Sequence, residues 1–469
     1  MTAWARAFVT SVDWLVLAYF VGLHGAYLLF LLLSAFALRD YMRRLRYGAY
    51  DLLFQNPATP AVSVLMPAYN EAVNIAVSVR GVLNLNYPAF DVIVINDGSR
   101  DGTLAELKRE FALVRTERDF EGRLPTRAVR AVYRSLSAPN LTVIDKDNGG
   151  KSDSLNAGIN AARTPYVCAV DADIVMEEDA LLRVMRPIVE DPERVVAVGG
   201  IVRIANGCRI AHGRVVEPRL PRSLLPMFQV VEYLRAFLGA RTGLSSVNGL
   251  LIISGAFGVF SRLRALEVGG YRTDTVGEDM ELVCALHARL RESGRAYRVV
   301  FVADPVCWTE VPGDATTLSR QRRRWQRGLL EALALHRRML FDGRYGVLGW
   351  LSYPFFFFFE GWGPAVEIAG YLSVTLSLLM GWVDASFAFA FLTLSIGLGV
   401  TITLCSIVLE ELTFHRYRAW TDLARMTLYG LIENLGYRQL TSLYRCLGLW
   451  DYLRGRQGWG EMRRAGLGA

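Results

Sequence analysis

The chain has 469 residues, of which 52% are hydrophobic, with a mean hydropathy of +0.25 and a formal net charge of +7. This hydropathy is high for a soluble enzyme and predicts one large domain joined to a membrane part. The arginines gather at the ends of apolar segments, as they do at cytoplasmic membrane flanks, so we expect no nucleic acid partner. Six cysteines without CxxC spacing exclude a zinc or disulfide framework.

The first predicted element is a membrane anchor at residues 14–38, WLVLAYFVGLHGAYLLFLLLSAFAL. It exceeds the ~20 apolar residues that cross a bilayer. No small-residue cleavage site follows, so we expect an anchor and not a removable signal. The basic run RDYMRRLR comes next and assigns the following region to the cytoplasm by the positive-inside rule.

Residues 61–315 have the pattern of an α/β domain, because short Val/Ile-rich runs alternate with helical segments. The runs are VSVLMP (62–67), DVIVIND (91–97), LTVID (141–145), YVCAVDAD (166–173) and VVAVGGIVRI (195–204). Continuous apolar strands of this kind predict a mostly parallel sheet covered on both faces. A charged insertion at 114–140 is expected to be a surface excursion without an assigned role.

Polar motifs follow each of the first four predicted strands: PAYNE, NDGS, DKDNGGKSD and DAD. Ligands of such sheets bind at the carboxyl ends of the strands, so these motifs should meet in one place. Asp171 and Asp173 of DAD form a pair that can share a divalent cation with phosphate oxygens, or simply end a strand. Asp97 either accepts a hydrogen bond from a nucleoside or belongs to a strand–turn–helix junction with Asp101 as the cap.

Two further motifs carry candidate chemistry. GGKSD brings a lysine, Lys151, on a glycine loop that is otherwise an ordinary entry into a helix. GED brings Glu278 and Asp279 to a helix start, where they either suit the helix dipole or include a general base. Neither a dinucleotide-binding glycine loop nor an ATP-binding phosphate loop is found, which disfavours hydride transfer and ATP hydrolysis.

The stretch QRRRW is either a basic membrane flank or a clamp for a phosphorylated donor. If residues 316–330 are helical, Gln321, Arg324 and Trp325 share one face. Arginine grips phosphate oxygens in a bidentate manner, and a tryptophan ring is a platform for a sugar.

The chain becomes strongly apolar again from residue 345. Residues 345–383 predict an interfacial helix followed by one span, or two spans, and 385–409 predict another span. Residues 426–450 are amphipathic and hold Glu433, Asn434, Arg438 and Gln439, so they should lie in the interface or line something wet.

Taken together, the ordered motifs resemble those of the processive family-2 glycosyltransferases, the cellulose, chitin, hyaluronan and poly-N-acetylglucosamine synthases. The resemblance covers roughly residues 60–330. It rests on PAYNE, NDGS, GGKSD, DAD, SGAFGVF (254–260), GED and QRRRW, in that order.

The resemblance implies a role for each matching position. Binding of the donor nucleotide and diphosphate falls to Ala68, Tyr69, Glu71, Asp97, Lys151, Asp171, Gln321 and Arg324. It makes Asp173, with Asp171, the ligand of Mn²⁺ or Mg²⁺, and Asp279 the base that deprotonates the acceptor hydroxyl. The acceptor side is formed by Trp325, Ser254, Gly255, Ala256, Phe257 and Glu278.

We therefore expect a GT-A-type, Rossmann-like α/β domain with α-helical transmembrane and interfacial segments. The expected division is an anchor at 1–45, a cytoplasmic transferase domain at 55–335, channel-forming helices at 336–455 and a basic cytoplasmic tail at 456–469. We expect no counterpart of the cyclic-dinucleotide-binding module of bacterial cellulose synthases, because nothing in the given sequence resembles it.

The expected activity is polymerisation of a β-linked exopolysaccharide from UDP-N-acetylglucosamine or UDP-glucose at the bacterial inner membrane. Its partners would be the UDP-sugar, the growing polysaccharide, the lipid bilayer and export or regulatory proteins. Two alternatives stay open: a transferase that adds one sugar to a ceramide- or diacylglycerol-type lipid, and an inactive membrane scaffold or receptor.

Overall fold

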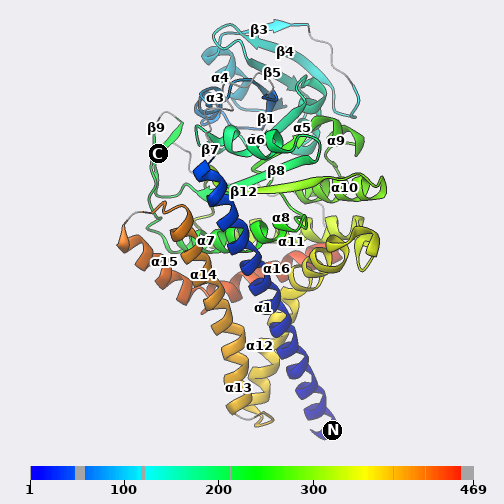
Figure 1. Ribbon diagram of the computed structural model, residues 1–469, viewed down its shortest axis with the longest axis vertical. Coiled ribbons are helices and arrows are strands. Elements are labelled where there is room, and N and C mark those ends of the chain that lie inside the picture. The colour runs from blue at the N-terminus through cyan, green and yellow to red at the C-terminus, as the bar shows by residue number, and fades with distance from the viewer. Residues whose placement is uncertain are drawn as a thin grey trace.

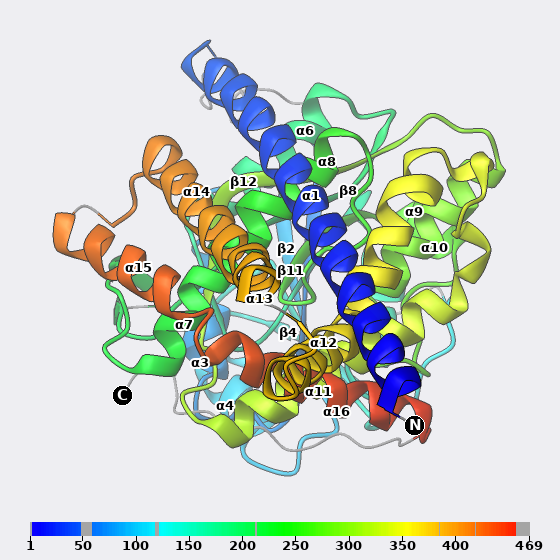
Figure 2. The same ribbon diagram turned by 90° about the horizontal axis from the view of Figure 1, so that it is seen from below.

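The computed structural model describes residues 2–47, 59–117, 122–211, 213–383, 385–417 and 419–455. An α/β part stands on a layer of helices, from which three long helical segments extend away side by side (Figures 1 and 2). The expected tail at 456–469 lies outside the described residues.

One ten-stranded sheet forms the α/β part, in the order β3-β4-β5-β2-β1-β6-β11-β8-β12-β7. Its strands are β1 (Val62–Ala68), β2 (Phe90–Asp97), β3 (Leu113–Thr116), β4 (Val129–Ser135), β5 (Leu141–Lys146), β6 (Tyr166–Val170), β7 (Ile174–Met176), β8 (Val195–Ile204), β11 (Phe257–Ser261) and β12 (Arg298–Thr309). The central block β5-β2-β1-β6 is parallel, and β8 pairs with β12 in parallel, whereas β11 and both edges are antiparallel.

This sheet confirms the predicted α/β class. Its buried strands are formed by the apolar runs of the sequence. Strand β1 is buried at six of its seven positions and β8 at all ten, as strands covered on both faces require. The insertion at 114–140, expected as a surface excursion, holds most of β3 and all of β4, which extend the sheet at one edge. A separate hairpin joins β9 (Arg209–Ala211) to β10 (Arg214–Glu217).

Helices cover the sheet and separate it from the extended helices. Those packed around the strands are α3 (Ile75–Leu83), α4 (Thr103–Glu110), α5 (Lys151–Ala161), α6 (Ala180–Glu190), α9 (Arg262–Glu267) and α10 (Glu278–Glu292). The layer below consists of α7 (Leu224–Leu234), the π-helical turn η1 (Arg235–Arg241), α8 (Thr242–Ser246), α11 (Ala315–Leu335), α15 (Trp420–Ile432) and α16 (Tyr437–Leu453) (Figure 1).

The extended part is built from α1 (Thr2–Tyr47), α12 (Gly363–Leu379) and the run α13 (Ala385–Leu392), η6 (Thr393–Gly397) and α14 (Leu398–Thr413). Within the described residues two helices, Arg6–Arg44 and Ser386–Thr413, are long and apolar enough to cross a membrane, and α12 is shorter. Ahead of α12 run the short turns η2 (Arg337–Met339), η3 (Gly343–Tyr345), η4 (Leu348–Ser352) and η5 (Phe355–Gly361). Residues 345–383 thus form short turns followed by one apolar helix, and how they lie relative to a membrane stays a prediction.

Ion pairs connect the extended helices to the rest of the protein. On α14, the buried Glu410 pairs with Arg203 of β8 at 2.6 Å. Arg438 of α16 pairs with Glu367 of α12 at 2.8 Å. Arg445 of α16 pairs with Glu360 of η5, also at 2.8 Å.

The polar residues of 426–450, which were expected to lie in the interface or line a water-filled space, make contacts within the protein. Glu433 is buried and accepts hydrogen bonds from Arg235 and from Thr403, the latter at 2.7 Å. Gln439 accepts the Gly436 N–H at 2.7 Å. These contacts neutralise charge that would be costly in lipid.

Candidate active site

The loop after β2 is organised by a buried lysine that sequence reasoning did not single out. β2 and β5 pair so that Asp97 faces Lys146, whose side chain is fully buried. The Lys146 ammonium lies 2.7 Å from Asp97 and 2.5 Å from Asp153, and donates to the Asp147 carbonyl at 2.7 Å. All three ammonium donors are thereby satisfied.

Asp97 is fully engaged by the protein. Besides Lys146, its carboxylate accepts the N–H groups of Gly149 at 2.9 Å and Gly150 at 2.8 Å, and the Asn148 amide at 3.1 Å. The sequence left two interpretations of Asp97 open, a hydrogen bond from a nucleoside or a place in a strand–turn–helix junction. The carboxylate holds the glycine loop that leads into Lys151, and its contact with a nucleoside stays a prediction.

The PAYNE loop lies against the NDGS loop. Asn70 has a positive φ of 56°, its N–H donates to Ser99 at 3.0 Å, and the Glu71 N–H donates to Thr103 at 2.9 Å. Tyr69 is 44% exposed, whereas Ala68 is buried at the end of β1. The two motifs thus meet at one edge of the sheet, as the topology predicts.

Lys151 is the centre of a second cluster. It begins α5, and its ammonium lies 2.6 Å from Asp171 and 3.8 Å from Glu278. It also donates to the Gly255 carbonyl at 2.9 Å. Burial lowers the pKa of the Lys151 ammonium, but the surrounding carboxylates, Asp171 first, raise this pKa more, and the net shift is upward.

The acids of GED lie in the same cluster, at the first turn of α10. The Asp279 carboxylate accepts the Gly255 N–H at 2.8 Å and the Met280 N–H at 2.8 Å, which fix its orientation. Burial raises the pKa of the Glu278 carboxyl to about 7, against the opposing charge of Lys151. A cavity with about 230 Å³ of empty space, part of it open to solvent, is bordered by both acids, by Lys151 and by Ser254 and Gly255.

One expected acceptor residue is not available to a ligand. Phe257 is the first residue of β11, between β6 and β8, and its side chain is fully buried in the hydrophobic core. The prediction that Phe257 contacts the acceptor is therefore wrong, because an aromatic ring in a central strand of the sheet packs inward. Ala256 contacts the cluster through its backbone, because its carbonyl accepts the N–H of Asp171 at 3.2 Å.

The QRRRW stretch is helical in α11, which meets the condition under which its residues share one face, and Asp314 caps this helix by accepting the Thr317 N–H at 2.9 Å. Gln321 is buried with no hydrogen-bond partner for its Oε1 among the described residues, and Trp325 is 41% exposed. Arg322 pairs with Glu232 at 2.8 Å, and its guanidinium lies 4.5 Å from the centre of the Trp325 ring. Arg322 and Glu232 therefore support Trp325 from behind, which the sequence alone did not reveal.

Helix α11 crosses the start of α10 at two glycines. A Cβ on Gly277 would lie 2.4 Å from the Gly328 carbonyl oxygen, so the two backbones are in contact. Glu331, one turn further along α11, accepts hydrogen bonds at 2.9 Å from the Thr275 hydroxyl and from the Val276 N–H. Gly328 lies three residues after Trp325, so the QRRRW face adjoins the GED turn.

The structure thus brings Lys151, Asp171, Gly255, Glu278 and Asp279 into one cluster and joins it to the QRRRW helix through Gly277 and Gly328. Among the described residues, no group of three or more His, Cys, Asp or Glu side chains could hold a metal ion by itself. Two carboxylates spaced like Asp171 and Asp173 fit a hard cation only when phosphate oxygens and water complete its shell.

An α/β sheet with an acid and lysine cluster at its strand ends, bordered by a helix rich in arginine, is typical of a group-transfer enzyme. Two family models match the chain. Residues 63–230 match Glycosyl transferase family 2, and residues 166–404 match Glycosyl transferase family group 2. The chain belongs to the family-2 glycosyl transferases, which confirms the resemblance seen in its motifs.

Individual relatives are similar over the same region. A poly-β-1,6-N-acetyl-D-glucosamine synthase of Staphylococcus aureus (strain COL) is 29% identical over 273 residues, which is 58% of this chain and 55% of the relative. The synthase of that name from Staphylococcus epidermidis is 29% identical over 272 residues, with the same coverage. The chain thus spans about half the length of the curated relatives it matches.

Among solved structures, a mannosyltransferase from Pyrobaculum calidifontis in complex with GDP-Man and Mn²⁺ is 18% identical. The match covers 89% of this chain and 99% of that one, with a TM-score of 0.49.

Proposed function

We propose that this chain is a membrane-embedded, inverting glycosyltransferase that extends a β-linked polysaccharide from UDP-N-acetylglucosamine or UDP-glucose. One arrangement carries the proposal: the oriented Asp279 carboxylate and the Lys151 ammonium share a cluster that adjoins the QRRRW helix. The printed names of the staphylococcal relatives support a polysaccharide product. In this proposal residues 1–45 anchor the chain, 55–335 form the cytoplasmic transferase and 336–455 form the membrane and interface helices.

The proposed reaction is a single displacement at the anomeric carbon. The acceptor oxygen forms a bond to that carbon while the bond to the UDP phosphate oxygen breaks, and the acceptor proton passes to Asp279. The N–H groups of Gly255 and Met280 hold the Asp279 carboxylate in place for this step. Attack from the face opposite to the leaving group inverts an α-linked donor into a β-linked product.

Donor binding is assigned to the strand-end loops and α11. Tyr69, Glu71, Asp97 and Lys151 would border the nucleotide. Gln321 and Arg324 would hold the diphosphate by donating N–H groups to its oxygens. Asp171 and Asp173 would hold Mn²⁺ or Mg²⁺, which when bound neutralises charge on the departing diphosphate.

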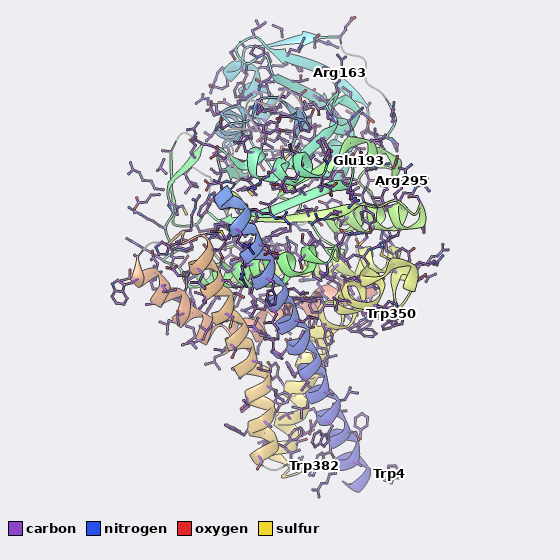
Figure 3. The ribbon with its side chains drawn as sticks, in the orientation of Figure 1. Trp4, Arg163, Glu193, Arg295, Trp350 and Trp382 are labelled. Atoms are coloured by element: carbon purple, nitrogen blue, oxygen red, sulfur yellow. The ribbon has the colours of Figure 1, made fainter. Side chains whose placement is uncertain are left out.

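Membrane attachment is supported by the distribution of aromatic side chains. Trp4 and Trp382 lie at the far end of the extended helices, whereas Trp350 of η4 lies at the level of the helix layer below the α/β part (Figure 3). Tryptophans gather at the two interfaces of a bilayer. We propose an inner-membrane location with the α/β part in the cytoplasm.

A glycolipid product is the second candidate. It is favoured by the pairing of Glu433 with Arg235, and of Arg438 with Glu367, because these side chains were expected to line a wet passage for a polymer. A transferase that adds one sugar to a lipid needs no such passage.

The test is incorporation of radiolabelled sugar by purified protein with Mn²⁺, from UDP-N-acetylglucosamine and from UDP-glucose in parallel. We expect product that is retained on a filter, and Asp279→Asn should abolish it while leaving UDP affinity intact. Asp147→Asn, a matched change at an exposed carboxylate paired with Arg130, should retain activity. Small, lipid-soluble product would favour the glycolipid alternative, and near wild-type turnover by Asp279→Asn would refute the assignment of the base.

A further inference from the structure

Tyr271 borders the cavity beside Asp279 with a phenol that has no partner among the described residues. The residue is only 4% exposed, yet its recorded hydrogen bonds all belong to its backbone, and none is formed by its hydroxyl within the described part of the chain. A buried phenol normally finds a hydrogen-bond partner. A free phenol that borders a cavity therefore points to a ligand.

Asn156 of α5 fixes the backbone of Tyr271 with both atoms of its amide. Its oxygen accepts the Tyr271 N–H and its nitrogen donates to the Tyr271 carbonyl, each at 2.8 Å. Gly270 permits this close approach, because its φ is +70° and a Cβ there would lie 2.4 Å from the Asn156 oxygen. The rings of Tyr271 and Phe260 meet edge to face, with their centres 6.2 Å apart. The phenol is thus held in place by the protein itself.

The lining of this cavity has two chemical characters. Charged groups border it, namely Lys151, Glu278 and Asp279. Buried apolar side chains supply another part of the lining: Leu155, Ala169, Ile253 and Phe260. Against an apolar wall a sugar hydroxyl loses water without gaining a partner, whereas a methyl group is stabilised by burial. The cavity therefore suits a substituent that combines a methyl group with a hydrogen-bond acceptor for the phenol.

Two of the bordering residues decide which part of the substrate lies in the cavity. Lys151 is assigned to the donor nucleotide, and Asp279 to the acceptor hydroxyl. In a single displacement the transferred sugar lies between its leaving diphosphate and the base that takes the acceptor proton. A cavity bordered by both residues is therefore where the transferred sugar lies.

We propose that Tyr271 binds the acetamido group of the transferred sugar and thereby selects UDP-N-acetylglucosamine over UDP-glucose. The phenol donates to the carbonyl oxygen of that group, and its methyl lies against the apolar side chains of Leu155 and Ile253. Glucose carries a hydroxyl in place of the acetamido group, so it has no methyl to bury there. This inference rests on the proposed function and names the donor sugar, which is left open there between two.

The experiment compares Tyr271→Phe, which removes only the phenol oxygen, with Tyr133→Phe, a matched change on β4. Each purified variant receives UDP-N-acetylglucosamine or UDP-glucose with Mn²⁺, and kcat/KM is measured for both donors. We expect the wild type and Tyr133→Phe to prefer UDP-N-acetylglucosamine. Tyr271→Phe should lose about tenfold of that preference, as one hydrogen bond of about 1.4 kcal/mol implies. Its kcat/KM for UDP-glucose should change less than twofold.

Calorimetric titration with UDP and with each UDP-sugar separates sugar recognition from turnover. Tyr271→Phe should keep the wild-type affinity for UDP and for UDP-glucose, and lose affinity for UDP-N-acetylglucosamine alone. Its Tm should be no lower than that of the wild type, because the hydroxyl has no partner to lose. An unchanged preference, an equal loss for both UDP-sugars, a wild-type preference for UDP-glucose or a lowered Tm would each overturn the inference. A wild-type protein that binds UDP-N-acetylglucosamine in this Tyr271-dependent way but transfers no sugar would overturn the proposed function and leave the binding site standing.

Discussion

Replacing the buried Lys146 with methionine tests whether one cation organises the donor loop. The change leaves Asp97 and Asp153 as carboxylates that are 3% and 6% exposed and have lost their counter-ion. Breaking a buried pair from one side costs about 3–5 kcal/mol. At 2–4 °C per kcal/mol for a domain of this size, the Tm should fall by roughly 8–16 °C for a loss of about 4 kcal/mol.

The assay is intrinsic-fluorescence unfolding in detergent, together with UDP binding. We expect UDP affinity to fall as well, because Lys151 follows directly on the loop that Asp97 holds. Lys108→Met provides the control, since Lys108 is exposed and contacts only the face of the Tyr133 ring at 4.5 Å among its recorded partners. Adding Asp153→Asn to the Lys146→Met protein should recover part of the lost Tm, because one unpaired carboxylate is removed. Equal Tm values for the two methionine variants would refute the reasoning.

Two further predictions concern α10. His287 is fully buried between the Tyr297 hydroxyl and the Leu250 carbonyl, and burial lowers the pKa of its imidazole to about 4. The unfolded chain therefore binds the extra proton first on acidification, and stability should fall by about 2 kcal/mol between pH 7.5 and pH 5. His287→Gln should remove that part of the pH dependence of Tm, and an unchanged slope would contradict it. Gly277→Ala should reduce transfer at least tenfold, because its Cβ would meet the Gly328 carbonyl at 2.4 Å and displace the Asp279 turn. Gly313→Ala, where a Cβ meets nothing within 4 Å, should retain activity; equal rates for the two would show that the glycine contact does not position the base.

Much of the fold could be predicted because the buried strands are visible in the sequence as short apolar runs. Val/Ile runs such as those of β1 and β2 are apolar at consecutive positions, and parallel sheets bury both faces. The sequence predicted a shared face for the QRRRW side chains only on the condition that the stretch is helical, and the structure meets this condition. The antiparallel strand β11 was missed because SGAFGVF was interpreted only as a ligand wall, and its Phe257 is a core residue.

The role of Lys146 could not be predicted, for a different reason. Lys146 becomes the partner of Asp97 only through the register between β2 and β5, which joins residues 49 positions apart. Sequence motifs identify candidate residues within a short stretch of chain. Which charged side chains form ion pairs with each other depends on the fold.

The ion pair between Arg203 and Glu410 has a consequence for biogenesis. Glu410 lies near the end of the last long apolar helix, and its counter-charge belongs to strand β8, which leaves the ribosome about two hundred residues earlier. A lone glutamate is poorly tolerated by lipid. In the proposed membrane location, we therefore expect the final helix to settle against a sheet that has already formed, so that the α/β part serves as the template for assembly of the extended helices.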